Sequence, residues 1–185
     1  MPTIKLPTFL QSLFAPRIVY REVNSLEDFE FVISRCLAES EAGHFSEIYT
    51  VKNQDIQDGL KKQMGCAALG KPYPLEPWNP RNGTGSMMKI IEVKKQKVGF
   101  VLLLEDMPGS KNEKIELHLL SILPEFRGQG IGKDTVKVIL KTMAAREIYA
   151  RCYSKSLAMI DILRKAGFEV TDETKLGTKT LTIRR

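Results

Sequence analysis

Three glycines at alternate positions, Gly128, Gly130 and Gly132, stand in the stretch PEFRGQGIGKDT, between an apolar run and a charged run. A strand that turns into a helix at such a loop leaves the first amides of the helix without intrahelical acceptors. The helix dipole adds partial positive charge there, and Arg127 and Lys133 add full charges. The stretch predicts an anion cradle suited to a pyrophosphate. The alternative is a tight turn without a ligand, but one turn rarely needs three glycines and two flanking cations.

The common nucleotide-binding loops fit this spacing poorly. A P-loop needs four residues between its glycines and a hydroxyl residue after the lysine, whereas three residues separate Gly128 from Gly132 and Asp134 follows Lys133. A dinucleotide loop needs a third glycine where Lys133 stands, and an acid after the next strand, where IYARCY ends in Tyr153. The spacing excludes a Walker loop and argues against a dinucleotide.

Apolar periodicity and turn residues predict the elements around the loop. In chain order we expect a strand (17–23), a helix that opens with Ser25 and Asp28 as a capping box, a polar helix (53–69), three strands (87–93, 97–107, 115–123), a helix (132–146), a strand (148–153), a helix within 156–170 and a last strand (181–185). In the helix within 156–170, Gly167 is placed as the left-handed stop and Phe168 as the hydrophobic residue that returns to the core. This order predicts an α/β or α+β fold with a mixed sheet. We expect one domain over residues 17–185 and an N-terminal extension over residues 1–16.

Composition narrows the class of protein. The chain has 185 residues, 43% of them hydrophobic and 27% charged, which fits one globular domain. No apolar run approaches the ~20 residues of a membrane span, and the first residues lack the features of a secretory signal. The net charge of +6 is spread along the chain, so neither a membrane nor a nucleic acid is an expected partner.

Cysteine and histidine usage points to the cytoplasm and away from metals. Cys36, Cys66 and Cys152 are an odd number without metal-ligand spacing, which favours free thiols in a reducing compartment. His44 and His118 lie far apart, so we expect no metal site. The short apolar piece within residues 1–16 is expected to dock on the domain or on a partner chain, which makes a homodimer one expectation.

Two stretches resemble one family. LPEFRGQGIG resembles the R-x-x-G-x-G/A motif of the GCN5-related N-acetyltransferases, and SLAMIDILRKAGFEV resembles the family's helix that ends in Gly-Phe. The resemblance covers about Val19 to Ile183. It implies a splayed mixed sheet that binds acetyl-CoA as co-substrate, and transfer of the acetyl group to a primary amine of a small molecule or protein. A non-catalytic module that binds acyl-CoA is the alternative.

The resemblance also implies a set of CoA-binding residues. The pyrophosphate would lie on the loop and helix start, and the pantetheine would extend the sheet along the preceding strand. Ser156 stands where many members have an asparagine at the start of their helix. The expected set is Ile122, Leu123, Arg127, Gly128, Gln129, Gly130, Ile131, Gly132, Lys133 and Ser156.

Acetyl transfer needs a base, and Glu116 is the candidate. Strand alternation puts Glu116, His118 and Leu120 on one face, and burial on an apolar strand raises the pKa of a carboxyl group toward neutrality. His118 would work with Glu116 directly or through water. A polar strand edge with a structural histidine is the other interpretation.

The acid for the leaving thiolate is harder to assign. Members of the family often have a tyrosine where this chain has Leu163, which cannot give a proton. Tyr153 is the candidate by proximity, and Cys152 beside it is more typical of a small core residue. Departure of the thiolate without an acid is the alternative.

The acceptor is expected to bind between the N-terminal helices and the loop 70–86. Aromatic rings and carboxylates suit a cationic amine, although they also suit an ordinary polar surface. The residues are Tyr49, Tyr73, Trp78, Glu39, Glu41, Glu47 and Glu76.

Overall fold

The computed structural model describes residues 18–71, 85–106, 113–144 and 146–184. The extension 1–16 and the loop residues Tyr73, Glu76 and Trp78 lie outside these ranges. The elements are β1 (Ile18–Arg21), α2 (Leu26–Glu41), η1 (Glu47–Thr50), α3 (Gln54–Ala68), β2 (Ser86–Val93), β3 (Gln96–Asp106), β4 (Lys114–Ile122), η2 (Pro124–Phe126), α4 (Ile131–Thr142), β5 (Glu147–Cys152), α5 (Leu157–Lys165), β6 (Glu169–Glu173) and β7 (Lys179–Ile183).

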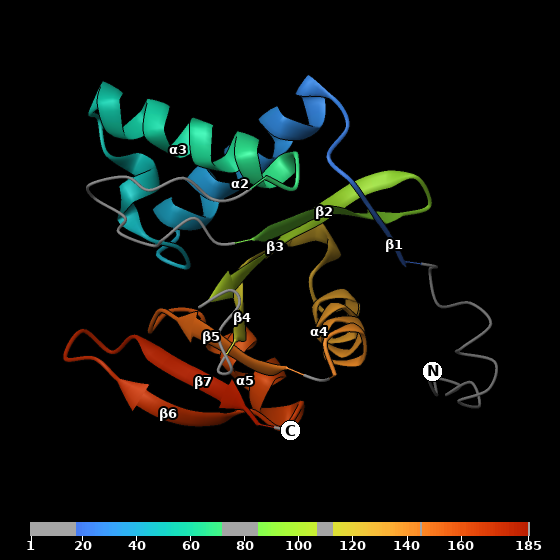
Figure 1. Cartoon of the computed structure of the whole chain (residues 1–185), viewed down its shortest axis with the longest axis vertical. Helices are drawn as coiled ribbons and strands as arrows, with labels where there is room; N and C mark the ends of the chain where they lie inside the picture. Colours follow the sequence, from blue (N-terminus) through green and yellow to red (C-terminus); the bar gives the residue numbers. More distant parts are fainter. Residues whose placement is uncertain (1–17, 72–84, 107–112, 145, 185) are drawn as a thin grey trace, which may run out of the picture.

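The strands of the described ranges form one mixed sheet in the order β1-β2-β3-β4-β5-β7-β6. β4 and β5 pair in parallel, and the other neighbours pair antiparallel. Helices α2 and α3 cover one face of β2 to β4, and α4 lies on the other face (Figure 1). The predicted fold class, a mixed sheet flanked by helices, is confirmed.

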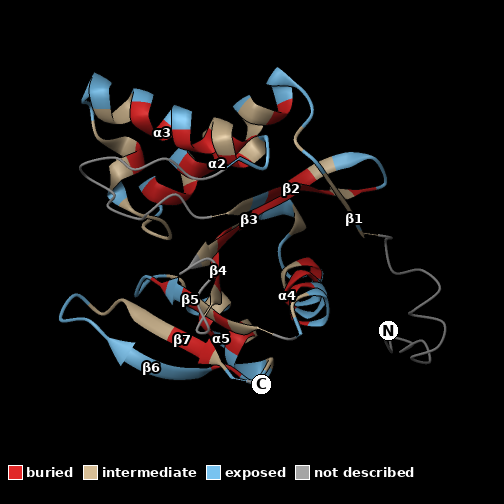
Figure 2. Cartoon of the chain, viewed as in Figure 1, coloured by how far each residue is buried: buried red, intermediate tan, exposed pale blue. Residues whose placement is uncertain are grey.

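Two apolar cores lie on the two faces of the sheet. Phe100, Leu102 and Leu104 of β3 point toward α2 and α3, whereas Val101 and Leu103 belong to the core under α4 and α5. Residues 98–104 of β3 are therefore buried without interruption, because successive side chains enter the two cores in turn (Figure 2). No helix in the described ranges is long and apolar enough to cross a membrane.

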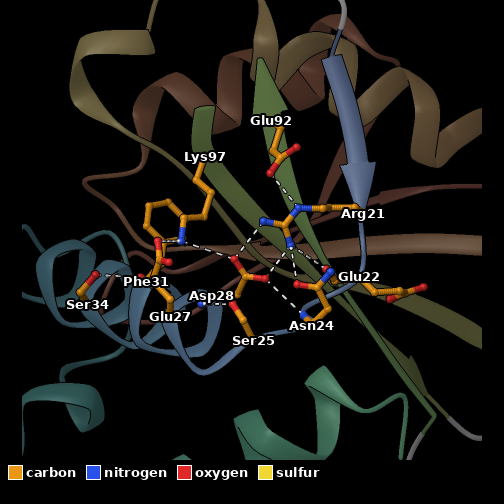
Figure 3. Close-up of polar contacts among 10 residues, drawn as sticks. All are labelled: Arg21, Glu22, Asn24, Ser25, Glu27, Asp28, Phe31, Ser34, Glu92 and Lys97. Carbon is orange, nitrogen blue, oxygen red and sulfur yellow. Dashed lines mark hydrogen bonds and ion pairs between the residues drawn. The ribbon is translucent and has the colours of Figure 1, made fainter. Parts of the chain in front are cut away.

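Asp28 fastens the start of α2 to the sheet. The hydroxyl of Ser25 caps the helix by accepting from the Asp28 amide at 3.1 Å, as the sequence predicts. The Asp28 carboxylate accepts from both terminal nitrogens of Arg21, at 2.6 and 2.9 Å, and lies 3.4 Å from Lys97 Nζ (Figure 3). Arg21 also donates to Glu92 of β2 at 2.7 Å. One buried carboxylate thus joins α2 to β1, β2 and β3.

Two predicted boundaries are wrong. The helix expected to reach Arg146 ends at Thr142, because the chain needs a turn before β5, in which the Arg146 amide donates to Met143 O at 3.1 Å. The hairpin turn is shorter than expected, since β3 already begins at Gln96. Lys94 and Lys95 both have positive φ, the conformation of a two-residue hairpin turn.

Strand β6 was not predicted from the sequence. The predicted stop of the preceding helix is confirmed, because α5 ends at Lys165, Gly167 adopts a φ of 96° and Phe168 is buried. All five residues of β6 are exposed, so the strand has no apolar alternation to reveal it. It forms because β7 offers a free edge for backbone pairing.

A β-bulge interrupts β4 at His118. Leu117 and Leu119 pair with consecutive residues of β3, which leaves His118 as the extra residue. Beyond the bulge the side chains exchange faces: Leu119 joins the core under α2 and α3, and Leu120 packs under α4 and α5. The prediction that Glu116, His118 and Leu120 share one face is therefore wrong for Leu120.

Replacing Asp28 by asparagine tests this anchor. Hydrogen bonds from Arg21 hold the pKa of Asp28 well below its usual value, although burial acts to raise it. We expect Asp28→Asn to lower the free energy of unfolding by about 2 kcal/mol at neutral pH. The contribution of Asp28 is full above about pH 4 and is lost as the pH falls further, because the unfolded chain then binds the proton first.

Urea unfolding between pH 7 and pH 2.5 measures the difference in free energy of unfolding between the unaltered protein and Asp28→Asn. Asp55→Asn, an exposed change in the first turn of α3, is the control and should move the stability by a few tenths of a kcal/mol. Equal free energies of unfolding for the unaltered protein and Asp28→Asn at pH 7 would contradict the anchoring role of Asp28. A difference that grows on acidification would contradict it too.

Candidate active site

The space between β4 and β5 opens soon after the strands pair. Parallel pairing joins Lys114–Glu116 to Glu147–Tyr149, although β4 continues to Ile122 and β5 to Cys152. Beyond Glu116, among the described residues, the edge of β4 that faces β5 has no strand partner. The opening is a cavity of about 610 Å³, also lined by the α2–η1 turn, the glycine loop and the start of α5.

The N-terminus of α4 points its amides at this cavity. The helix begins at Ile131 without a side-chain cap, and its first intrahelical bond runs from the Asp134 amide to Gly130 O at 2.9 Å. The amides of Ile131, Gly132 and Lys133 therefore have no acceptor within the helix. All three residues line the cavity. The geometry is that of an anion cradle.

The three glycines of the loop serve different purposes. Gly128 and Gly130 have φ values of 77° and 84°, a left-handed conformation that favours glycine. Gly132 lies within the helix, where a Cβ atom would approach Cδ1 of Ile162 on α5 to 3.3 Å. Two glycines thus shape the turn, and the third lets α4 and α5 pack closely.

Two hydrogen bonds, from different nitrogens, hold the guanidinium of Arg127 in place. Its Nε donates to Ile122 O at 3.0 Å, and its Nη2 donates to Glu39 at 2.5 Å. The side chain still keeps 43% of its surface exposed at the cavity. Arg127 is therefore held in place beside the cradle.

Two of the expected CoA-binding residues do not line the cavity. The amide of Leu123 donates to Val98 O in β3 at 2.8 Å, so its backbone is already paired in the sheet. The side-chain amide of Gln129 donates to Glu125 O at 3.1 Å. The other expected residues line the cavity: Ile122, Arg127, Gly128, Gly130, Ile131, Gly132, Lys133 and Ser156.

Ser156 joins the two sides of the opening. Its hydroxyl donates to the backbone oxygen of His44 at 3.2 Å. His44 follows α2 and Ser156 precedes α5, so this bond connects the α2–η1 turn to the C-terminal half of the sheet across the cavity.

Glu39 of α2 is the centre of a buried ionic network. One carboxylate oxygen accepts from Arg35, from Ser121 of β4 at 2.9 Å and from Arg127, and the other lies 2.7 Å from His44 Nδ1. Burial acts to raise the pKa of Glu39, but the bonds from His44 and Ser121 and the charges of the two arginines outweigh it. The pKa therefore lies below its ordinary value, and Glu39 is ionised at neutral pH.

The structure describes four of the seven residues predicted to form the cationic-amine surface around α2, since Tyr73, Glu76 and Trp78 lie outside the described ranges. Glu39 is taken up by the network just described, and Glu41 and Glu47 are exposed away from the cavity. Tyr49 lines the cavity but is only 7% exposed. No described carboxylate of this group is left to recognise a cation.

Glu116 lies where β4 and β5 part, and it is 2% exposed. Arg151 Nε donates to its Oε1 and the Tyr149 hydroxyl to its Oε2, each at 3.2 Å. His118 Nδ1 lies 3.2 Å from Oε1. The sequence predicts apolar surroundings for Glu116, but β5 supplies a cation and a hydroxyl. Glu116, His118 and Arg151 all line the cavity.

The end of β5 holds the candidates for an acid. Tyr153 lines the cavity and is 37% exposed. Cys152 also lines it but is mostly buried, and burial raises the pKa of its thiol to about 11. Leu163, at the position of the missing tyrosine, is fully buried in the core. Tyr153 is thus the candidate with an exposed protic group. Within the described ranges no group of three histidine, cysteine or acidic residues is placed to hold a metal ion.

Polar residues of the site that were not predicted from the sequence include His44 and Arg151, which line the cavity, and Tyr149, which donates to Glu116. Alternation along IYARCY would have put Tyr149, Arg151 and Tyr153 on one face. The i, i+4 spacing of Arg35 and Glu39 was a further signal for a salt bridge. No local signal places His44 beside Glu39 on a cavity wall.

Comparison with known proteins agrees with this geometry. The model of the acetyltransferase (GNAT) family matches residues 53–168, and the chain belongs to this family. No curated protein sequence matches it.

The chain is also similar to solved structures. An acetyltransferase from Thermus thermophilus is 13% identical, with a TM-score of 0.63 over 91% of this chain and 97% of that one. Naa50 of Arabidopsis thaliana, solved with the bisubstrate analogue CoA-Ac-MVNAL, is 17% identical, with a TM-score of 0.61 over 91% and 99%. The PaiA N-acetyltransferase of Thermoplasma acidophilum, solved with coenzyme A, is 18% identical, with a TM-score of 0.60 over 91% and 99%. At these identities the likeness shows a shared fold.

The Glu39 network makes a prediction about stability. Glu39→Ala leaves the buried Arg35 with its bond to Ser121 but without a carboxylate partner, so we expect the free energy of unfolding to fall by about 3–5 kcal/mol. Glu41→Ala, an exposed change at the end of the same helix, should cost about 0.5 kcal/mol or less. Equilibrium urea unfolding compares them, and equal losses would mean that the network does not hold α2 on β4.

Proposed function

We propose that the protein transfers an acetyl group from acetyl-CoA directly to a primary amine of a small molecule or protein. The observation that carries this proposal is the cavity between β4 and β5. It combines an anion cradle at one end, an unpaired strand edge along its side, and the polar cluster around Glu116 where the strands part. Family membership and the coenzyme A held by the PaiA N-acetyltransferase support acetyl-CoA as the donor.

The donor would bind through its pyrophosphate and its pantetheine arm. The amides of Ile131 to Lys133, with the charges of Arg127 and Lys133, suit a pyrophosphate. The arm carries amide groups, which can pair with the free edge of β4 as an added strand does. This arrangement leads the thioester from the α4 side toward Glu116.

The transfer itself needs a neutral amine and a polarised thioester. The pair of Glu116 and His118 would accept the proton of the ammonium group. The amine nitrogen then attacks the thioester carbon, and a backbone amide on the free edge of β4 stabilises the developing oxyanion. When the carbon–sulfur bond breaks, its electrons stay on the sulfur, and Tyr153 is the residue we propose to protonate it. The nitrogen, positively charged after the attack, then gives its surplus proton to the Tyr153 phenolate, which leaves a neutral amide and restores the tyrosine.

The activity is tested with acetyl-CoA and a panel of primary amines, by following the release of free thiol. We expect turnover with at least one amine. Glu116→Gln should lower kcat by about 100-fold or more, because general base catalysis contributes at least this much. Tyr153→Phe should lower kcat less, since the thiolate is a fair leaving group. Release of no thiol with any amine, despite CoA binding, would leave the non-catalytic acyl-CoA-binding module as the better account.

The role of the cradle is tested separately. S-acetyl-pantetheine carries the same thioester but lacks the pyrophosphate, so we expect its kcat/KM to fall by about 100-fold or more against acetyl-CoA. Lys133→Gln should raise KM for acetyl-CoA and leave KM for S-acetyl-pantetheine unchanged, whereas Lys137→Gln, an exposed change one turn later, should affect neither. Equal use of both donors would refute the pyrophosphate site.

A further inference from the structure

The charges that line the cavity are unbalanced. The two carboxylates among its described lining residues are Glu39 and Glu116, and both are almost fully buried. Each already accepts from cationic or hydroxyl groups of the protein. The cavity therefore offers a substrate no carboxylate that is not already engaged, whereas cationic side chains on its wall remain partly exposed.

Arg151 is the cation nearest to the expected chemistry. Its Nε donates to Glu116, and its terminal nitrogens Nη1 and Nη2 donate to no residue that the structure describes. The side chain is 46% exposed and lines the cavity. Because one edge of the guanidinium is fixed by Glu116, the two terminal nitrogens are held in a fixed orientation toward a ligand.

Arg151 lies on the opposite side of the sheet from the anion cradle. Ile148, Ala150 and Cys152 point into the core under α4 and α5, so the alternate residues of β5, Tyr149 and Arg151, point to the side of α2 and η1. The cradle lies at the start of α4. A donor held by the cradle therefore leaves Arg151 for the second substrate.

We propose that Arg151 binds a carboxylate of the acceptor, so that the acceptor is an amine that also carries a carboxylate. This rests on the proposed function. The amino group would lie at Glu116 and His118, and the carboxylate on the terminal nitrogens of Arg151, which meet it as a two-pronged fork. A plain diamine, with a second positive charge in place of the carboxylate, is repelled at the same position.

A matched pair of acceptors tests the proposal on the unaltered protein. An unbranched ω-amino acid and its primary amide have the same amine and nearly the same shape, and differ in one negative charge. We expect kcat/KM to be about 10- to 100-fold higher for the acid, the usual effect of a charge-assisted hydrogen-bonded pair. Equal values, or a preference for the amide or a diamine, would overturn the proposal and leave the acetyltransferase activity standing. Turnover of no amine at all would overturn both.

Variants separate binding by Arg151 from its contact with Glu116. Arg151→Gln should lower the ratio of kcat/KM for the acid to that for the amide by about 10-fold or more, mainly through KM for the acid. Arg151→Lys keeps the positive charge but loses the two parallel donors. Its acid-to-amide ratio of kcat/KM should lie between those of the unaltered protein and Arg151→Gln. A loss that is the same for the acid and the amide would show that Arg151 only orients Glu116, and would overturn the proposal.

Arg164→Gln is the control, because Arg164 is exposed on α5 and does not line the cavity. It should leave the acid-to-amide ratio unchanged. Thermal unfolding with and without CoA checks that each variant is folded. If Arg151→Gln does not fold, the matched acceptors on the unaltered protein still decide the question.

Discussion

The short parallel pairing between β4 and β5 is the constraint on which the rest of the structure depends. The two strands share three residue pairs and then separate, and the bulge at His118 falls just beyond the last of them. Had the pairing continued, backbone hydrogen bonds would fill the space that is now a cavity. The unpaired edge, the cradle behind it and the position of Glu116 all follow from this separation.

Buried charge is the second theme of the site. Glu39 and Glu116 lie at different levels of the cavity wall, and each is surrounded by groups that donate to it. A buried carboxylate without such donors would cost several kcal/mol, so the surrounding arginines are a condition for its presence. The carboxylates therefore add little attraction for a cation from solution, and the potential inside the cavity is set by the exposed ends of arginine and lysine side chains.

The features predictable from the sequence were those with a local cause. The glycine loop, the Ser25 cap and the stop at Gly167 each depend on backbone conformation over a few residues, and the sequence displays them directly. The bulge at His118 depends on how β4 pairs with β3, and no residue type announces it, so the face of Leu120 came out wrong. β6 was missed because an exposed edge strand is held by backbone pairing with its neighbour and buries no side chains, so its sequence carries no apolar pattern. Glu39 looked like a surface carboxylate, since two of its partners, Ser121 and Arg127, come from β4 and the glycine loop, far along the chain.

The position of Glu39 has a consequence for how the two substrates affect each other. Arg127, beside the cradle, and His44, on the α2–η1 turn, share this one carboxylate. A pyrophosphate that draws Arg127 toward itself weakens its hold on Glu39 and leaves the carboxylate more fully to His44. Binding on one side of the sheet would then change the electrostatics on the other, and by thermodynamic reciprocity a second ligand would change the affinity of the first by the same factor. Glu39 is thus one link between the two sides of the cavity, beside the bond from Ser156 to the backbone of His44.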